Sequence, residues 1–118
     1  MTAETIAWYL MAFKFRYQSE IELHEGITLA LTAMRAEFVR EYRLTEKDRL
    51  DFYLPNERIA IEVKIKGSAA EVLRQLTRYA EHDEIQSIVL VTTRTQQAYR
   101  IPMMLNEKAI TVCLLRSL

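Results

Sequence analysis

The strongest constraint on the fold lies in residues 58–67, whose sequence is RIAIEVKIKG. Every second residue of 59–65 is Ile or Val, and this alternation predicts a strand with one buried face. The other face carries Glu62 and Lys64. Two interpretations of that face are open, a solvated strand surface and a catalytic site.

A second strand is predicted immediately before the first. Residues 49–54 have the sequence RLDFYL, and PNE at 55–57 predicts a tight turn because Pro fixes φ and Asn tolerates left-handed backbone. The two strands should therefore form a hairpin that brings Asp51 across from about residue 61. A period-2 count groups Asp51 with Arg49 and Tyr53 on one face, and Leu50, Phe52 and Leu54 on the other.

Capping boxes mark the starts of two helices, because Ser19 precedes Glu22 and Ser68 precedes Glu71 by three residues. Apolar spacing extends these helices to about residues 36 and 82. Further strands are predicted at 38–44, 87–93 and 109–115, with a short helix around 96–100.

This order predicts an α/β fold, with a mixed central sheet flanked by helices. The helix that starts at Ser68 should make strands 58–66 and 87–93 parallel. Residues 1–18 fit either a helix or a strand, and we expect them to form an N-terminal segment that serves in oligomerisation, before a domain at 19–118.

Composition excludes several kinds of protein. The chain has 118 residues, zero formal net charge and 27% charged residues, so bulk charge does not indicate a nucleic-acid partner. The single cysteine, Cys113, lies in an apolar run and is expected in the core. The apolar run near residue 10 is too short to span a bilayer, so we expect a cytoplasmic protein without a membrane partner.

Common catalytic motifs are also missing. Two glycines cannot supply a phosphate-binding loop, and there is no Cys/His cluster for zinc. His24 and His82 look isolated in the sequence.

The remaining candidates are acidic. Asp51 and Glu62 can point to the same side of neighbouring strands, where two carboxylates repel unless a cation lies between them. Mg²⁺ fits, because it uses one or two carboxylates with waters and substrate phosphate. With Lys64 beside them to assist a water molecule, this set suits phosphodiester hydrolysis.

The two predicted helices add further candidates. Glu20 falls on the apolar face of the first helix, where it either joins the site or only complements the helix dipole. On the second helix Gln75 and Tyr79 share one side, with Arg74 and Arg78 beside them. These four are either an amphipathic flank or a surface for a phosphate backbone.

Together these residues resemble the PD-(D/E)xK nuclease superfamily. Asp51, Glu62 and Lys64 match its acid, turn and Glu-x-Lys motif, and Leu50 stands where a proline often does. Gln75 and Tyr79 match the Q-x-x-x-Y motif of its recombination-exonuclease branch. The predicted order resembles its αβββαβ restriction-endonuclease-like core, and the similarity covers about residues 19–93.

The resemblance implies a small DNA-cleaving enzyme, similar to Holliday-junction resolvases or phage nucleases. It implies dependence on Mg²⁺ or Mn²⁺ and often a homodimer. Asp51 and Glu62 would hold the metal, with the Val63 carbonyl and Glu20 as further ligands, and Glu22 or Glu25 as weaker options in place of Glu20. Cutting would be structure-selective or non-specific. Two alternatives stay open, an inactive nuclease-like module that binds DNA or protein, and an unrelated α/β protein.

Overall fold

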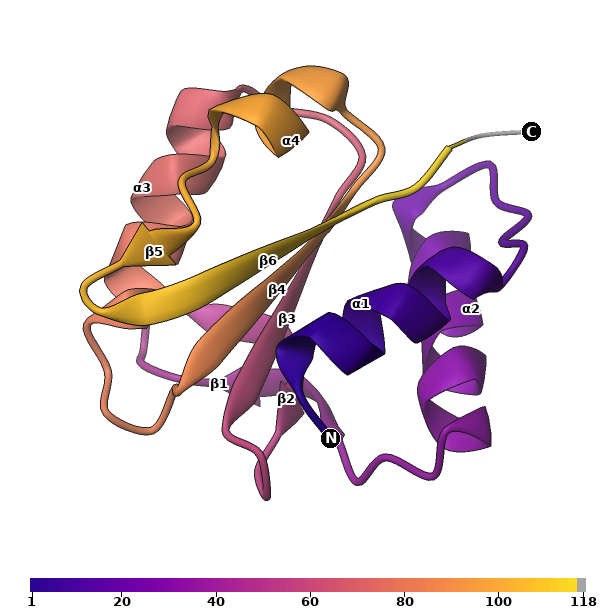
Figure 1. Ribbon diagram of the computed structural model, residues 1–118, viewed down its shortest axis with the longest axis horizontal. Helices are drawn as coiled ribbons and strands as arrows, with labels where there is room; N and C mark the ends of the chain where they lie inside the picture. Colours follow the sequence, from indigo (N-terminus) through magenta and orange to yellow (C-terminus); the bar gives the residue numbers. More distant parts are fainter. Residues whose placement is uncertain (117–118) are drawn as a thin grey trace.

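The structure, a computed structural model, describes residues 1–116 and has a six-stranded mixed sheet flanked by helices (Figure 1). This confirms the predicted α/β class. The elements in chain order are α1 (Ala3–Ala12), α2 (Glu20–Ala33), β1 (Val39–Arg43), β2 (Arg49–Leu54), β3 (Ile59–Lys64), α3 (Ala69–Ala80), β4 (Ser87–Thr92), α4 (Thr95–Arg100), β5 (Met104–Leu105) and β6 (Lys108–Leu114).

The strands lie in the order β1-β2-β3-β4-β6-β5. The hairpin of β2 and β3 is antiparallel, and β3 and β4 are parallel, as predicted. β4 is also parallel to β6, so Lys64, Thr92 and Leu114 lie in one row across the sheet. The C-terminal ends of β3, β4 and β6 therefore lie side by side, and they form one edge of the sheet.

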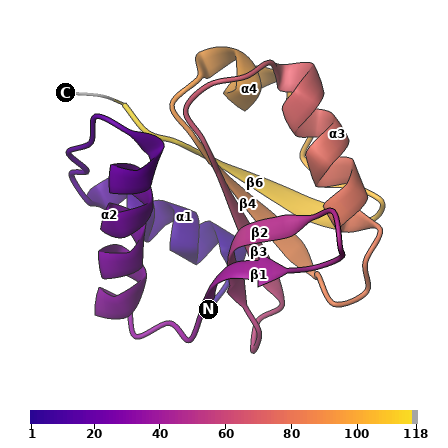
Figure 2. The same cartoon turned by 180° about the vertical axis from the view of Figure 1, so that it is seen from behind.

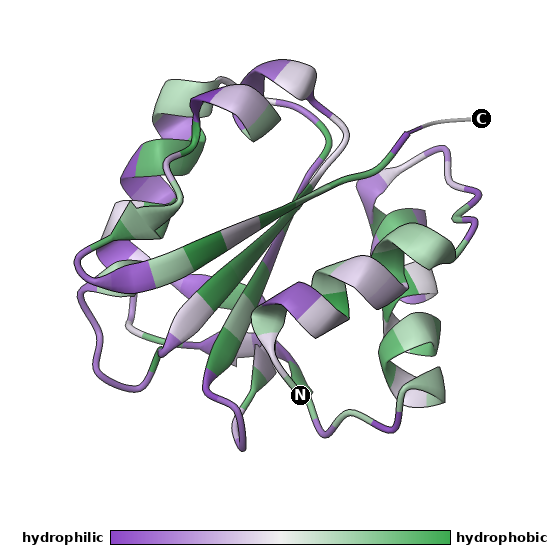
Figure 3. Cartoon of the chain, viewed as in Figure 1, coloured by the Kyte–Doolittle hydropathy of each residue, from purple (hydrophilic) through white to green (hydrophobic). Residues whose placement is uncertain are grey.

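The sheet separates two apolar clusters. α1 and α2 cover one face, and α3 and α4 cover the other (Figures 1 and 2). Ile61 and Val63 face the first cluster while Ala60 faces the second, which is the alternation predicted for β3. Strand β4 is apolar along most of its length (Figure 3), and the fully buried Cys113 lies beside it on β6, as expected.

The predicted alternation along β2 is wrong at its start. Leu50 packs in the cluster under α3, whereas Phe52 and Leu54 pack in the cluster under α1 and α2. The regular pairing of β2 with β3 begins at Phe52, and the neighbouring Glu41 of β1 has a left-handed φ of 51°. The backbone is thus irregular on both sides of Asp51, which a period-2 count cannot anticipate.

Several boundaries also differ from the prediction. Residues 3–12 form a helix whose Ile6 and Leu10 are fully buried, so the N-terminal segment shares the core of domain 19–118. The first predicted helix ends at Ala33 rather than near residue 36. The two-residue strand β5 falls in a region predicted as a connection. Over residues 1–116 no helix is both long and apolar enough to cross a membrane.

A buried glutamine fixes the turn that follows β3. Gln97 is fully buried on α4, and its Nε2 donates to the carbonyls of Lys66 and Gly67 at 3.1 and 2.9 Å. Its Oε1 accepts from the Thr92 hydroxyl at 2.6 Å. The first two bonds hold the backbone just beyond Lys64, and the third ties Gln97 to β4.

Replacing this side chain should destabilise the protein. Gln97→Leu removes three hydrogen bonds, one of them from the buried Thr92 hydroxyl, so we expect the free energy of unfolding to fall by about 1–3 kcal/mol. Urea denaturation measures this loss of unfolding free energy. Gln96→Leu at the exposed neighbouring position is the matched control, and equal stability of both variants would contradict this role for Gln97.

Candidate active site

Glu62 is the centre of the candidate site. It lies on β3 with 3% of its surface exposed, which is rare for a carboxylate. Its Oε1 accepts from the Tyr79 hydroxyl at 3.3 Å, and its Oε2 lies 3.4 Å from the Lys64 Nζ. The predicted acid and lysine are therefore in direct contact.

Asp51 lies at the point where β2 leaves β3. Its Oδ2 accepts a hydrogen bond from the backbone N–H of Val63 at 2.8 Å, which takes the place of a regular backbone pair. This bond places the carboxylate beside Glu62, as the hairpin prediction required.

The helix α3 braces this pair from the other side. Gln75 Nε2 donates to the Tyr79 hydroxyl at 2.8 Å, and that hydroxyl lies 3.3 Å from both Glu62 Oε1 and the Arg49 carbonyl. Tyr79 is fully buried. Gln75 and Tyr79 thus orient Glu62.

The surroundings disfavour the charged forms of both acids. Burial, and next the charge of Asp51, raise the pKa of Glu62 to about 8, although Lys64 acts in the opposite direction. Burial also raises the pKa of Asp51, while the Val63 N–H, His24 and Lys64 lower it and Glu20 raises it. Burial therefore outweighs the favourable charge of Lys64 at both carboxylates.

His24 belongs to this site, and the sequence interpretation of it as isolated is wrong. Its Nε2 lies 3.7 Å from Asp51 Oδ2, within ion-pair range but beyond a hydrogen bond. The same atom is buried and has no hydrogen-bond partner within residues 1–116. A signal existed, because His24 follows Glu20 by four residues and precedes the buried Ile27 by three.

The three glutamates of α2 have different surroundings. The charge of Glu20 acts on Asp51, whereas Glu22 accepts from the Gln18 N–H at 3.1 Å at the helix start. Glu25 pairs with Arg40 at 3.1 Å on the surface. Glu20 is therefore the one that acts on the site. Still, no group of three or more His, Cys, Asp and Glu side chains in the described part of the chain could hold a metal ion.

The two arginines of α3 also differ. Arg78 binds both carboxylate oxygens of the buried Asp48 at 2.9–3.2 Å, and its contact with phosphate stays a prediction. Arg74 is exposed.

A polar hollow of about 180 Å³ opens beside Lys64. Lys66 and Gln75 also line it, with Arg78 and Glu71 at its margin. Lysine side chains at such a hollow suit a phosphate group.

Comparison of the chain with protein-family models, with curated proteins and with solved structures finds no match. The residue geometry therefore carries the functional argument.

The raised pKa of Glu62 has a consequence for stability. Between the ordinary pKa of 4.5 and about 8, the folded protein binds more protons at this group than the unfolded chain. The free energy of unfolding should therefore fall as pH rises through this window. Glu62→Gln cannot ionise, so its stability relative to the native protein should be greater at about pH 8 than at about pH 5.

Urea denaturation at the two pH values, without divalent metal, measures this difference. Glu46→Gln, at an exposed turn, is the matched control and should show no such trend. A pH-independent difference between Glu62→Gln and the native protein would show that Glu62 titrates normally.

Proposed function

We propose that this protein is a metal-dependent deoxyribonuclease of the PD-(D/E)xK type, which hydrolyses phosphodiester bonds of DNA. The observation that carries the proposal is the contact set of Glu62, with Lys64 at 3.4 Å and the Asp51 charge beside it. Two neighbouring acids with raised pKa values in a braced, partly open site are more characteristic of a reactive centre than of a strand surface.

The donor set suits Mg²⁺, with Mn²⁺ as a substitute. Asp51 and Glu62 would hold the ion with the Val63 carbonyl, and Glu20, which does not form a three-acid group with them, would tune the site through its charge on Asp51. The proximity of the two acids, which raises the pKa of Glu62, and the partnerless nitrogen of His24 both support a bound cation. When bound, the metal would activate water and polarise the phosphate.

The chain's own residues would divide the remaining work. Lys64 has 26% of its side chain exposed, so its ammonium group can reach a substrate and stabilise negative charge on phosphate oxygens. Gln75 and Tyr79 would hold the Glu62 carboxylate in one orientation. The exposed Arg74 would contact the DNA backbone.

A second function has one observation in its favour. Residues 1–116 provide no set of three metal-binding side chains, and Arg78 is engaged by Asp48. An inactive nuclease-like module that binds DNA or protein would also have these features. Its weakness is the cost of keeping two buried acids together without a cation.

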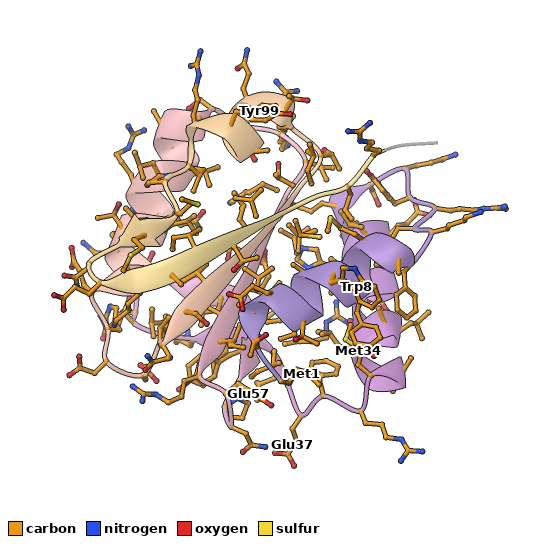
Figure 4. All side chains as sticks on the ribbon, viewed as in Figure 1. Met1, Trp8, Met34, Glu37, Glu57 and Tyr99 are labelled. Carbon is orange, nitrogen blue, oxygen red and sulfur yellow. The ribbon has the colours of Figure 1, made fainter. Side chains whose placement is uncertain are left out.

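We further propose a cytoplasmic homodimer that assembles through α1. Trp8 and Tyr9 are 66% and 44% exposed, and Trp8 lies on the outer side of that helix (Figure 4). Exposed apolar side chains on one helix are typical of an interface.

Sedimentation of the purified protein tests the dimer. We expect a dimer at micromolar concentration, and we expect Trp8→Lys to sediment as a monomer because it places a charge in the apolar contact. A monomeric native protein would refute the assembly without affecting the nuclease proposal.

A cleavage assay tests the nuclease proposal. Purified protein with Mg²⁺ or Mn²⁺ should cut at least one of plasmid, linear, single-stranded and branched DNA. Asp51→Asn and Lys64→Ala should lower the rate by at least about 100-fold, because the first weakens a ligand of the proposed metal and the second removes positive charge at the reacting phosphate.

Matched controls come from the exposed turn between β1 and β2. Glu46→Ala and Lys47→Ala remove the same kinds of charge and should retain full activity. If no DNA form is cut with either metal, the enzyme proposal fails. If the site variants cut as fast as the controls, the activity belongs to a contaminant.

A further inference from the structure

A second hollow, of about 310 Å³, lies between residues 13–17 and the end of β6. Its wall includes the aromatic rings of Phe13, Phe15 and Tyr17 and the cationic side chains of Lys14 and Arg116. None of these residues belongs to the site described above. The sequence FKFRY, which alternates aromatic and basic residues, is not a strand in the structure but the edge of this hollow.

The hollow lies at the same edge of the sheet as Lys64. Lys64 pairs with Thr92 on β4, and Thr92 pairs with Leu114 on β6, which lines the hollow. Because two strand spacings separate β3 from β6, the Cα atoms of Lys64 and Leu114 are roughly 10 Å apart. Residues 13–17 also lead directly into the start of α2, where Glu20 acts on Asp51.

The aromatic wall has a fixed support. Phe15 packs against Gly26 of α2 so closely that a Cβ there would lie 2.8 Å from its ring. Phe13 stacks on Phe15 with ring centres 6.1 Å apart and is itself 38% exposed. An exposed ring that stands on a fixed ring offers a flat face to a ligand.

Aromatic faces with nearby cations suit nucleotides of a single strand. Bases stack on aromatic rings whatever the sequence, and cations bind the adjacent phosphates. Bases inside a duplex are already stacked and cannot reach such a surface without leaving the helix. The chain has zero net charge, so stacking can supply affinity that bulk charge does not.

We propose that this hollow binds an unpaired nucleotide of the DNA strand a few nucleotides from the bond that is cut. The inference rests on the proposed nuclease function and deepens it, because it assigns the substrate class. The substrate is DNA with a single-stranded extension or branch next to a duplex.

Fluorescence anisotropy without divalent metal tests this assignment, since binding is then measured apart from cleavage. The probes are a labelled blunt duplex and the same duplex with a thymine extension at either end. We expect tighter binding of an extended duplex. Phe13→Ala should weaken that binding about tenfold and leave the blunt duplex unchanged. Lys14→Gln should make the slope of log binding constant against log salt concentration shallower by about one, because it removes one cation that contacts phosphate.

Met103→Ala, which shortens an 82% exposed apolar side chain outside the hollow, is the matched control and should bind like the native protein. Circular dichroism establishes that each variant is folded. Equal affinity of native protein for blunt and extended duplexes would overturn the proposal, as would unchanged binding by both Phe13→Ala and Lys14→Gln. If the native protein binds the extended duplex more tightly but cuts no form of DNA, the nuclease proposal fails and the hollow remains a nucleotide-binding site.

Discussion

The structure depends on one unfavourable contact, the enforced proximity of the Asp51 and Glu62 carboxylates. The hairpin of β2 and β3 places both acids at the same side, and the Val63 N–H holds Asp51 there at 2.8 Å. Burial raises both pKa values, and repulsion by Asp51 adds to the shift of Glu62. The cation that we propose would offset this cost, because it supplies positive charge between the two acids.

The rest of the fold supports this contact from both faces. The cluster under α3 positions Tyr79, whose hydroxyl reaches Glu62 while Gln75 holds it in place. The cluster under α1 and α2 positions the start of α2, from which Glu20 and His24 act on Asp51. Gln97 fixes the turn after Lys64. The candidate site and the aromatic hollow thus share one edge of one sheet.

The parts that sequence predicts well are those set by local rules. The turn after Leu54 fixes the hairpin, so the meeting of Asp51 and Glu62 could be anticipated, and capping boxes locate two helix starts. Non-local features could not be derived. Arg78 forms an ion pair with Asp48, 30 residues earlier in the chain, and His24 lies near Asp51 only because α2 packs on the sheet. The alternation of β2 fails near Asp51, where its regular pairing with β3 begins only at Phe52 and Glu41 of the neighbouring β1 has a left-handed φ, and strand periodicity encodes neither feature.

Calorimetric titration with Mg²⁺ in two buffers of different ionisation enthalpy tests the central claim most directly. Because the pKa of Glu62 is raised to about 8, this carboxyl is largely protonated at neutral pH and must lose its proton when a cation binds. We predict saturable binding near neutral pH whose heat differs between the buffers by the proton released, and loss of that difference in Glu62→Gln. Absence of binding, or a heat that is the same in both buffers, would contradict the account.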